Sequence, residues 1–235
     1  MRILVYGDIH GNKYALEELQ KLDDYKMSDL RIFLGDVFAM CPYSKECLEK
    51  LLESKDILLM GNHDSYGAFG LPIEEFAYFS ERKIAHQKYM RDKLGEKLQN
   101  ELAKFPKDYH LKVGNVKLYF THYLWESDKL IADDPDEPAA PTEKTAKLFS
   151  NINAEYILFA HNHKPADFTS DDKRFICIGS LGMKKIGNYV VVEIENDRVA
   201  IKHKKLNYDL DRLLKEMQTE NYPSAESYIK WFNEE

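Results

Sequence analysis

The sequence predicts an α/β fold that contains both parallel and antiparallel β-strands. In the first 60 residues, short apolar runs alternate with amphipathic stretches in the order strand, helix, strand, helix, strand. This order is typical of parallel strands joined by helical crossovers. Later in the chain, two pairs of alternating runs are each joined by a short polar turn, which indicates antiparallel strands.

The elements of the first part of the chain follow from its periodicity. We expect strands at 3–6, 32–34 and 57–60, and helices at about 13–22 and 44–53. Sheets of this kind carry their binding and catalytic residues in the loops after the carboxyl ends of the strands. Those loops are therefore where we expect function to lie.

The second part of the chain begins with a helical segment. Residues 71–105 are rich in Glu, Lys, Ala, Gln and Leu and end at Pro106, so we expect a helical insertion there. A hairpin is expected at 109–113 and 116–120, because Gly114 and Asn115 readily adopt turn conformations. Further strands are expected at 157–160 and 175–178, an antiparallel pair at 189–194 and 199–204, and helices at about 209–220 and 224–232.

Composition is typical of a soluble globular protein. The 235 residues are 44% hydrophobic and 31% charged, which suits one domain spanning 1–235 with a sizeable core. No apolar run approaches the roughly 20 residues that a membrane-spanning helix needs. The apolar run at the start is too short for the core of a signal peptide and leads into an acidic motif, so it is expected to be a first strand.

Charge and cysteine content bear on partners and compartment. The formal net charge is −7, which disfavours nucleic acid, because polyanions are bound by clustered Lys and Arg. Cys41, Cys47 and Cys177 form no CxxC pair, so neither a disulfide framework nor a thiolate zinc site is expected. We expect a cytoplasmic protein without membrane association, and the sequence makes no prediction of its oligomeric state.

Polar side chains able to bind metals recur directly after the expected strands. One histidine in such a place is usually a structural residue with a local hydrogen bond. Here, however, five of the eight histidines follow strands, together with two aspartates and one asparagine. Strand ends on one edge of a sheet converge, so we expect these residues to meet in one place. They are Asp8, His10, Asp36, Asn62, His63, His122, His161 and His163.

This set of side chains indicates a metal site with more than one ion. Nitrogen and oxygen ligands without thiolates suit manganese, iron, zinc or nickel. About seven such groups exceed what one tetrahedral ion uses. Two divalent ions about 3.5 to 4 Å apart can hold a phosphoryl group and lower the pKa of a shared water. A carboxylate between the ions would reduce their repulsion, and Asp36 is the candidate for that bridge.

The same residues form a pattern that resembles the five-block signature of calcineurin-like metallophosphoesterases. The blocks are Asp8-x-His10, Gly35-Asp36, Gly61-Asn62-His63-Asp64, His122 and His161-x-His163. Any one block is weak evidence, whereas five in this order are specific. The resemblance extends over about residues 1–209. Similarity to the compact bacterial and archaeal phosphodiesterase-like branch is found at Pro42, in the helical insertion, and at Gly179-Ser180 and Tyr208-Asp209.

The resemblance implies a fold, a reaction and a set of ligands. The fold would be a four-layer α-β-β-α sandwich of two mixed sheets. The reaction would be hydrolysis of a phosphodiester or small phosphate ester by water activated between two divalent ions. Manganese is favoured, with iron, zinc, nickel or magnesium as alternatives. One ion would be held by Asp8, His10, Asp36 and His163, and the other by Asp36, Asn62, His122 and His161.

Three further residues near these blocks have roles that the resemblance implies or leaves open. His63 would bind no metal; it would face the substrate and protonate the leaving oxygen or stabilise the transition state. Asn12 would contact substrate, or alternatively cap the helix that begins at Lys13. Asp64 would orient His63, or alternatively be a solvated residue at the start of a helix.

The sequence also departs from the pattern of many protein phosphatases of the superfamily. Those enzymes follow Gly-Asp with a further Asp-Arg, whereas Gly35-Asp36 leads here to Val37-Phe38-Ala39-Met40. The carboxylate that usually orients the catalytic histidine is therefore missing at that place, which disfavours a protein phosphatase. A dinucleoside polyphosphate hydrolase, a protein phosphatase and a non-catalytic scaffold that kept the fold remain as alternatives. Retention of every ligand argues against the scaffold.

Other residues with chemical potential are expected to be structural. His86 lies in the helical segment and is expected to be partly exposed, while His110 and His203 have no companion motif. Cys41 lies beyond the ligand position of its block and is not expected to bind metal. The aromatic residues of the helical segment would line the substrate site or pack on the core; they are Phe69, Phe76, Tyr78 and Phe79.

Overall fold

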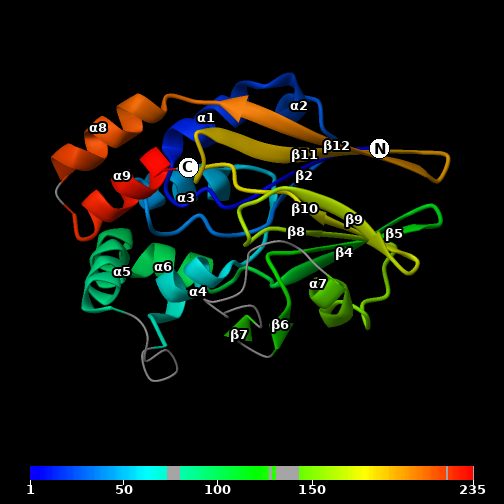
Figure 1. The fold of residues 1–235 in the computed structure, drawn as a ribbon, viewed down its shortest axis with the longest axis horizontal. Helices are drawn as coiled ribbons and strands as arrows, with labels where there is room; N and C mark the ends of the chain where they lie inside the picture. The colour runs from blue at the N-terminus through cyan, green and yellow to red at the C-terminus, as the bar shows by residue number, and fades with distance from the viewer. Residues whose placement is uncertain (73–79, 127–128, 131–142, 221, 235) are drawn as a thin grey trace.

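Two five-stranded β-sheets lie face to face at the centre of the molecule (Figure 1). The structure is a computed structural model, and it describes residues 1–72, 80–126, 129–130, 143–220 and 222–234. The N-terminus lies at one end of the sheets, and α5, α6, α8 and α9 gather at the other end (Figure 1).

The first sheet has the strand order β12-β11-β1-β2-β3. Parallel pairing joins β1, β2 and β3, whereas β11 pairs antiparallel with both β1 and β12. In this register Val5 stands opposite both Ile32 and Val190, so branched apolar side chains pack across three strands. The strands are β1 (Arg2–Tyr6), β2 (Leu30–Phe33), β3 (Ile57–Leu58), β11 (Ile186–Glu195) and β12 (Arg198–Asn207).

The second sheet has the strand order β4-β5-β8-β10-β9. Its three central strands are parallel and its two edge strands are antiparallel, so this sheet is also mixed. A separate short pair, β6 (Trp125–Glu126) and β7 (Lys129–Leu130), follows β5. The strands of the sheet are β4 (Asp108–Val113), β5 (Val116–Thr121), β8 (Tyr156–Phe159), β9 (Ala166–Ser170) and β10 (Lys173–Cys177).

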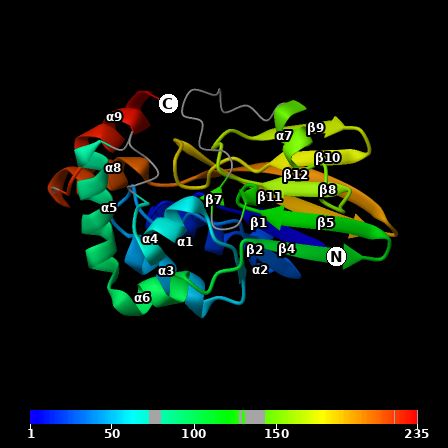
Figure 2. The same ribbon diagram turned by 90° about the horizontal axis from the view of Figure 1, so that it is seen from below.

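Helices connect the strands and close the chain. Figure 2 shows α4, α5 and α6 gathered at the end toward which β5 points. The described helices are α1 (Lys13–Lys21), α2 (Asp23–Lys26), α3 (Ser44–Glu53), α4 (Asn62–Phe69), α5 (Glu81–Leu94), α6 (Glu96–Leu102), α7 (Glu143–Leu148), α8 (Leu210–Glu220) and α9 (Ala225–Glu234).

The alternation of apolar residues along β1 explains the layers. Ile3 and Val5 belong to a core between the sheets that also contains Phe120 of β5. Leu4 and Tyr6 point to the other face of the first sheet, where they pack in a core with helical residues such as Leu16. A third core packs Phe159 and Phe175 of the second sheet against Phe149, which follows α7. The result is the expected four-layer sandwich, helices, sheet, sheet and helix.

Most strands expected from the sequence occur within one or two residues of their expected bounds. The hairpin at Gly114-Asn115 is found as β4 and β5, and the antiparallel pair is found as β11 and β12. Six of the described elements were not expected: β6, β7, β9, α2, α4 and α7. The acidic stretch at 133–138 and the aromatic residues Phe76, Tyr78 and Phe79 lie outside the described residues. No described helix is long and apolar enough to cross a membrane.

Candidate metal centre

Seven predicted ligands meet at one end of the two sheets. Each follows a parallel strand: Asp8 and His10 come after β1, Asp36 after β2 and Asn62 after β3. The second sheet contributes His122 after β5, and His161 and His163 after β8. The centre therefore lies where the carboxyl ends of both sets of parallel strands meet.

One half of the centre is formed by Asp8, His10 and His163. The Nε2 atoms of His10 and His163 are 3.2 Å apart. Asp8 Oδ1 lies 3.7 Å from His10 Nε2 and 3.5 Å from His163 Nε2. These three atoms all lie within 4.8 Å of one another, which is a spacing that one ion can span.

The other half is formed around Asn62 and His122. Asn62 Oδ1 lies 3.0 Å from His122 Nε2 and 3.1 Å from His161 Nδ1. Asp36 stands between the halves, because its Oδ2 is 3.2 Å from His122 Nε2 and 3.6 Å from His10 Nε2. The carboxylate that the sequence singled out as a bridge is thus the one that contacts both groups.

Backbone carbonyls fix two of the rings from behind. His10 Nδ1 lies 3.3 Å from the Phe38 carbonyl oxygen, and His122 Nδ1 lies 3.0 Å from the Leu34 carbonyl oxygen. A carbonyl can only accept, so each Nδ1 donates its proton and each Nε2 is the ring nitrogen that faces the centre. Such contacts behind the ligand are usual for metal-binding histidines.

The donor set fits divalent cations. Asp8 and Asp36 are buried, and Asp8 Oδ1 has no hydrogen-bond partner among the described residues. A buried carboxylate oxygen without a partner is costly unless a cation contacts it. Burial disfavours charge on Asp36, but neighbouring His122 holds the pKa of its carboxyl well below the usual value. Burial likewise opposes charge on His122, yet Asp36 raises the pKa of that imidazole to about 9. The cluster thus favours positive charge.

The backbone at the ligands adopts a conformation that few residues tolerate. Five ligands have a positive φ: Asp8 (52°), His10 (49°), Asp36 (63°), His161 (70°) and His163 (56°). A non-glycine residue in this region is strained, and such residues cluster at functional sites. Two glycines permit the close approach of the loops here. A Cβ on Gly35 (φ 101°) would lie 2.4 Å from the Gly61 nitrogen, and one on Gly61 would lie 2.1 Å from Asp36 Oδ1.

Asp64 holds the loop that carries Asp36. It is fully buried, so the expectation of a solvated residue is wrong. Its Oδ1 accepts hydrogen bonds from the amides of Val37 (2.9 Å) and Phe38 (3.1 Å). Its Oδ2 accepts from the amides of Asp36 (2.7 Å) and Gly61 (3.0 Å). Both oxygens are engaged with backbone, so no described contact supports Asp64 as the residue that orients His63.

Replacing Asp64 with alanine should destabilise the protein and weaken metal retention. Four buried amides would lose their acceptor, and each unsatisfied group costs about 1 to 3 kcal/mol. We expect the free energy of unfolding to fall by at least about 3 kcal/mol, measured by urea denaturation. Asp64→Asn keeps one acceptor oxygen and should lose less. Equal stability of Asp64→Ala and wild type would contradict this role.

Asn12 lies at the start of α1 and has its amide engaged within the protein. Its side-chain oxygen accepts from the Ala15 amide (3.2 Å), and its Nδ2 donates to the Gly182 carbonyl (2.8 Å). The capping role that the sequence left open is thus present. A contact between Asn12 and substrate stays a prediction.

His63 lies at the start of α4 beside the centre. Its ring stands edge-on to that of His10, with centroids 4.9 Å apart. One geometrically possible ligand group contains His63 together with His10 and Asp36, so position alone does not exclude it as a ligand. Burial lowers the pKa of the His63 imidazole well below its usual value, despite the nearby Asp36 carboxylate. Burial therefore disfavours the protonated form of the ring.

The structure adds residues that the sequence analysis missed. Gln87 of α5 reaches the His63 ring, and Trp231 of α9 lies 6.2 Å from His163 between ring centroids. No sequence pattern singles out Gln87, because the polar and apolar residues of α5 are not separated onto opposite faces of the helix. His86 was expected to be partly exposed, which is wrong: it is fully buried.

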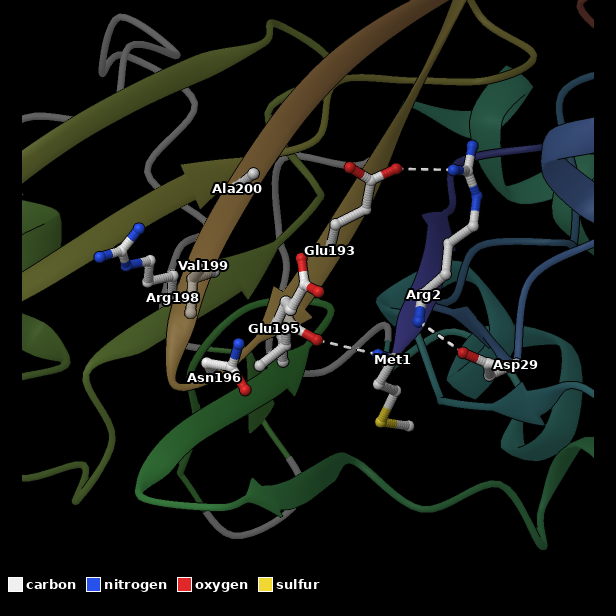
Figure 3. A pocket seen from close by; sticks show the side chains of 10 residues that line it. Met1, Arg2, Asp29, Glu193, Glu195, Asn196, Arg198, Val199 and Ala200 are labelled. Carbon is white, nitrogen blue, oxygen red and sulfur yellow. Dashed lines mark hydrogen bonds and ion pairs between the residues drawn. The ribbon is translucent and has the colours of Figure 1, made fainter.

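The remaining candidates lie away from the centre. Phe69 is 68% exposed at the end of α4. Cys41 is buried, and its burial raises the pKa of its thiol, which disfavours thiolate ligation. A surface cavity of about 800 Å³ is lined by the start of β1 and the β11–β12 turn (Figure 3). It lies at the opposite end of β1 from the ligands, and Arg2 and Glu193 pair with each other on its wall.

Solved structures of other proteins have a similar fold. The structure of a hypothetical protein from Pyrococcus horikoshii OT3 is similar, with a TM-score of 0.77, 21% identity, and coverage of 97% of this chain and 96% of that chain. A metallophosphoesterase from Sphaerobacter thermophilus gives a TM-score of 0.73, 20% identity, and coverage of 99% and 98%. A protein provisionally assigned as a diadenosine tetraphosphatase gives a TM-score of 0.54, 16% identity, and coverage of 86% and 93%.

At these identities the structural likenesses show the fold alone. No curated protein matches the chain significantly. The family assignment depends on the sequence itself, because residues 1–165, which include all seven ligands, match the family described as calcineurin-like phosphoesterase. Motifs, fold and ligand geometry therefore lead to one conclusion: the chain belongs to the calcineurin-like phosphoesterase family.

Proposed function

We propose that the protein hydrolyses a phosphodiester or a small phosphate ester with the help of two divalent metal ions. The observation that carries the proposal is the convergence of seven nitrogen and oxygen donors from both sheets around one shared carboxylate, Asp36. Family membership supports the phosphoester as the class of bond. The dinuclear site and the preference for diesters go beyond the family.

The donors divide into two sets that share Asp36. Asp8, His10, Asp36 and His163 would hold one ion, and Asp36, Asn62, His122 and His161 would hold the other. When bound, such ions neutralise phosphoryl oxygens and make a water acidic enough to attack phosphorus. Nitrogen and oxygen ligands suit manganese, iron, zinc or nickel. We take manganese as the first candidate, with iron, zinc, nickel or magnesium as alternatives.

His63 would assist departure of the leaving group. Its ring lies beside that of His10, at the edge of the ligand cluster. Because burial disfavours the protonated form of the ring, we assign it the role of a hydrogen-bond donor to the leaving oxygen rather than a full acid. The attacking water loses a proton to solvent and forms the new P–O bond, the P–O bond to the leaving group breaks, and solvent supplies the proton that the leaving group finally carries.

Metal analysis combined with a diesterase assay tests the proposal. Protein purified and reloaded with Mn²⁺ should contain about two equivalents per chain and should cleave bis(4-nitrophenyl) phosphate. Removal of metal by a chelator should abolish turnover, and Mn²⁺ should restore it. Faster cleavage of 4-nitrophenyl phosphate or of diadenosine tetraphosphate would replace the diesterase by one of the alternative hydrolases. A protein that binds no metal and cleaves none of the three esters would be a scaffold.

A further inference from the structure

Gln87 is one of two buried polar residues of α5, and the other is His86. Only 3% of the surface of Gln87 is exposed, and its helical neighbours Met90 and Leu94 are buried apolar residues. Burying an amide without partners is unfavourable, so its location needs a reason. Packing alone would be served equally well by leucine.

The single hydrogen bond of the Gln87 side chain goes to the proposed catalytic group. Gln87 Nε2 lies 3.3 Å from His63 Nδ1, and its Oε1 has no partner among the described residues. In the described part of the chain, no other side-chain hydrogen bond to the His63 ring is found. The Asp64 carboxylate, which lies next to His63 in sequence, is engaged with backbone amides.

Two anchors hold α5 so that Gln87 reaches His63. On one side of the contact, His86 Nε2 accepts from the Met40 amide at 3.2 Å, and His86 Nδ1 donates to the Pro223 carbonyl at 2.6 Å. On the other side, Arg91 donates to the Gly67 and Ala68 carbonyls at the end of α4, both at 3.1 Å. Since His63 begins α4, these contacts fix the helix of the donor against the helix of the histidine.

We propose that Gln87 is a positioning residue that donates a hydrogen bond to His63 Nδ1 and thereby keeps the ring proton of His63 on Nε2. The amide nitrogen of Gln87 can only donate, and a donor at Nδ1 requires a lone pair there. The proton must then lie on Nε2, on the other side of the ring. The inference rests on the proposed function of His63 as donor to the leaving oxygen.

A neutral amide suits this position between buried charged groups. A carboxylate can accept the Nδ1 proton but cannot donate to Nδ1, so it would favour the opposite tautomer. Gln87 sets the tautomer without adding negative charge beside Asp36 and Asp8. This chain lacks a carboxylate after its Gly35-Asp36 block, and Gln87 orients the histidine from a different element.

The tautomer is tested directly by nitrogen NMR of the Zn²⁺-loaded protein. In wild type, His63 Nδ1 should show the chemical shift of an unprotonated ring nitrogen, and Nε2 that of a protonated one. Gln87→Glu should reverse the two, because an ionised carboxylate only accepts. A protonated Nδ1 in the wild-type protein would overturn the inference. This readout does not depend on turnover, so it stands apart from failure of the proposed function.

A second experiment compares turnover of two diesters whose leaving groups differ in how readily they depart. Gln87→Leu should lower kcat about 10- to 100-fold for diphenyl phosphate, with KM and metal content unchanged. The loss should be smaller for bis(4-nitrophenyl) phosphate, because nitrophenolate needs less help to depart. Gln87→Glu should not restore kcat. Gln99→Leu is the matched control, since Gln99 Nε2 donates to the Arg91 carbonyl of the neighbouring helix at 2.9 Å, and it should leave the ratio of the two substrates unchanged.

The outcomes distinguish failure of the proposed function from failure of the proposed role of Gln87. If wild type cleaves neither ester with any tested metal, the proposed function fails. If wild type is active and His63→Ala is impaired while Gln87→Leu matches wild type, only the role of Gln87 fails. An equal loss for both esters in Gln87→Leu, with lower metal content or a lower melting temperature, would show a structural role and would also overturn the inference.

Discussion

Asp36→Asn should empty the metal centre and lower phosphoesterase turnover on the order of 10³-fold. Asp36 Oδ2 lies within 3.6 Å of His10 Nε2 and 3.2 Å of His122 Nε2, so the change removes a negative charge from between both ligand sets. Its Oδ1 accepts from the His63 amide at 2.8 Å, and asparagine can keep that bond. Asparagine also tolerates the φ of 63° better than alanine does. A loss of metal and turnover in Asp36→Asn would therefore result from the lost charge and metal ligation and not from backbone strain.

Metal content and kcat of Asp36→Asn should be measured together. We expect fewer than about two equivalents of Mn²⁺ after reloading. Asp171→Asn is a matched control, because Asp171 also has a positive φ, of 51°, but lies in an exposed turn between β9 and β10. Two equivalents and normal kcat in Asp36→Asn would show that Asp36 is not a bridging ligand.

His63→Ala should lower turnover roughly 10²- to 10³-fold without loss of metal. The expected loss corresponds to the removal of one donor to the charge that develops on the leaving oxygen. Metal content is the decisive second readout, because the geometry also admits a ligand group of His10, Asp36 and His63. If His63→Ala retains both ions, His63 is a substrate-facing residue and not a metal ligand.

His110→Ala serves as the control for this experiment. His110 is in β4, its side chain is 60% exposed, and it is not part of the centre. It should keep wild-type turnover. Unchanged turnover in His63→Ala would remove His63 from the mechanism, and with it the reason for the contact with Gln87.

The sequence predicted the parts of the fold that depend on local patterns. β1, β2 and β3 are short apolar runs separated by amphipathic helices, and Gly114-Asn115 fixes the hairpin of β4 and β5. β9 was missed because its Ala-Asp-Phe-Thr-Ser sequence is polar and half exposed at a sheet edge. The pairing of β11 with β1 joins residues about 190 positions apart, such as Arg2 with Glu193, which no local pattern specifies.

The candidate centre was predictable for the same reason. Each ligand directly follows a strand, so the topology of parallel strands alone brings the side chains together. Residues that support the ligands have no such marker. From the sequence, Asp64 was expected either to orient His63 or to be solvated. Its four acceptor contacts instead depend on how the 36–38 loop folds over α4.

Gln87 and His86 show where reading the sequence reaches its physical limit. Both lie in a helix whose composition predicts the helix but not its packing partner. His86 is buried because its ring bonds to two backbone groups, the Met40 amide and the Pro223 carbonyl. Pro223 lies 137 residues after His86 in the chain. A residue whose function depends on two distant backbone groups cannot be distinguished from a surface residue until the fold is known.

Electron paramagnetic resonance of the protein loaded with two equivalents of Mn²⁺ tests the central claim most directly. Two ions that share Asp36 would lie about 3.5 to 4 Å apart, so their spins should couple. We expect the spectrum of a coupled manganese pair in wild type and its loss in Asp36→Asn. A wild-type spectrum of isolated Mn²⁺ alone, at full loading, would contradict a dinuclear centre between the two sheets.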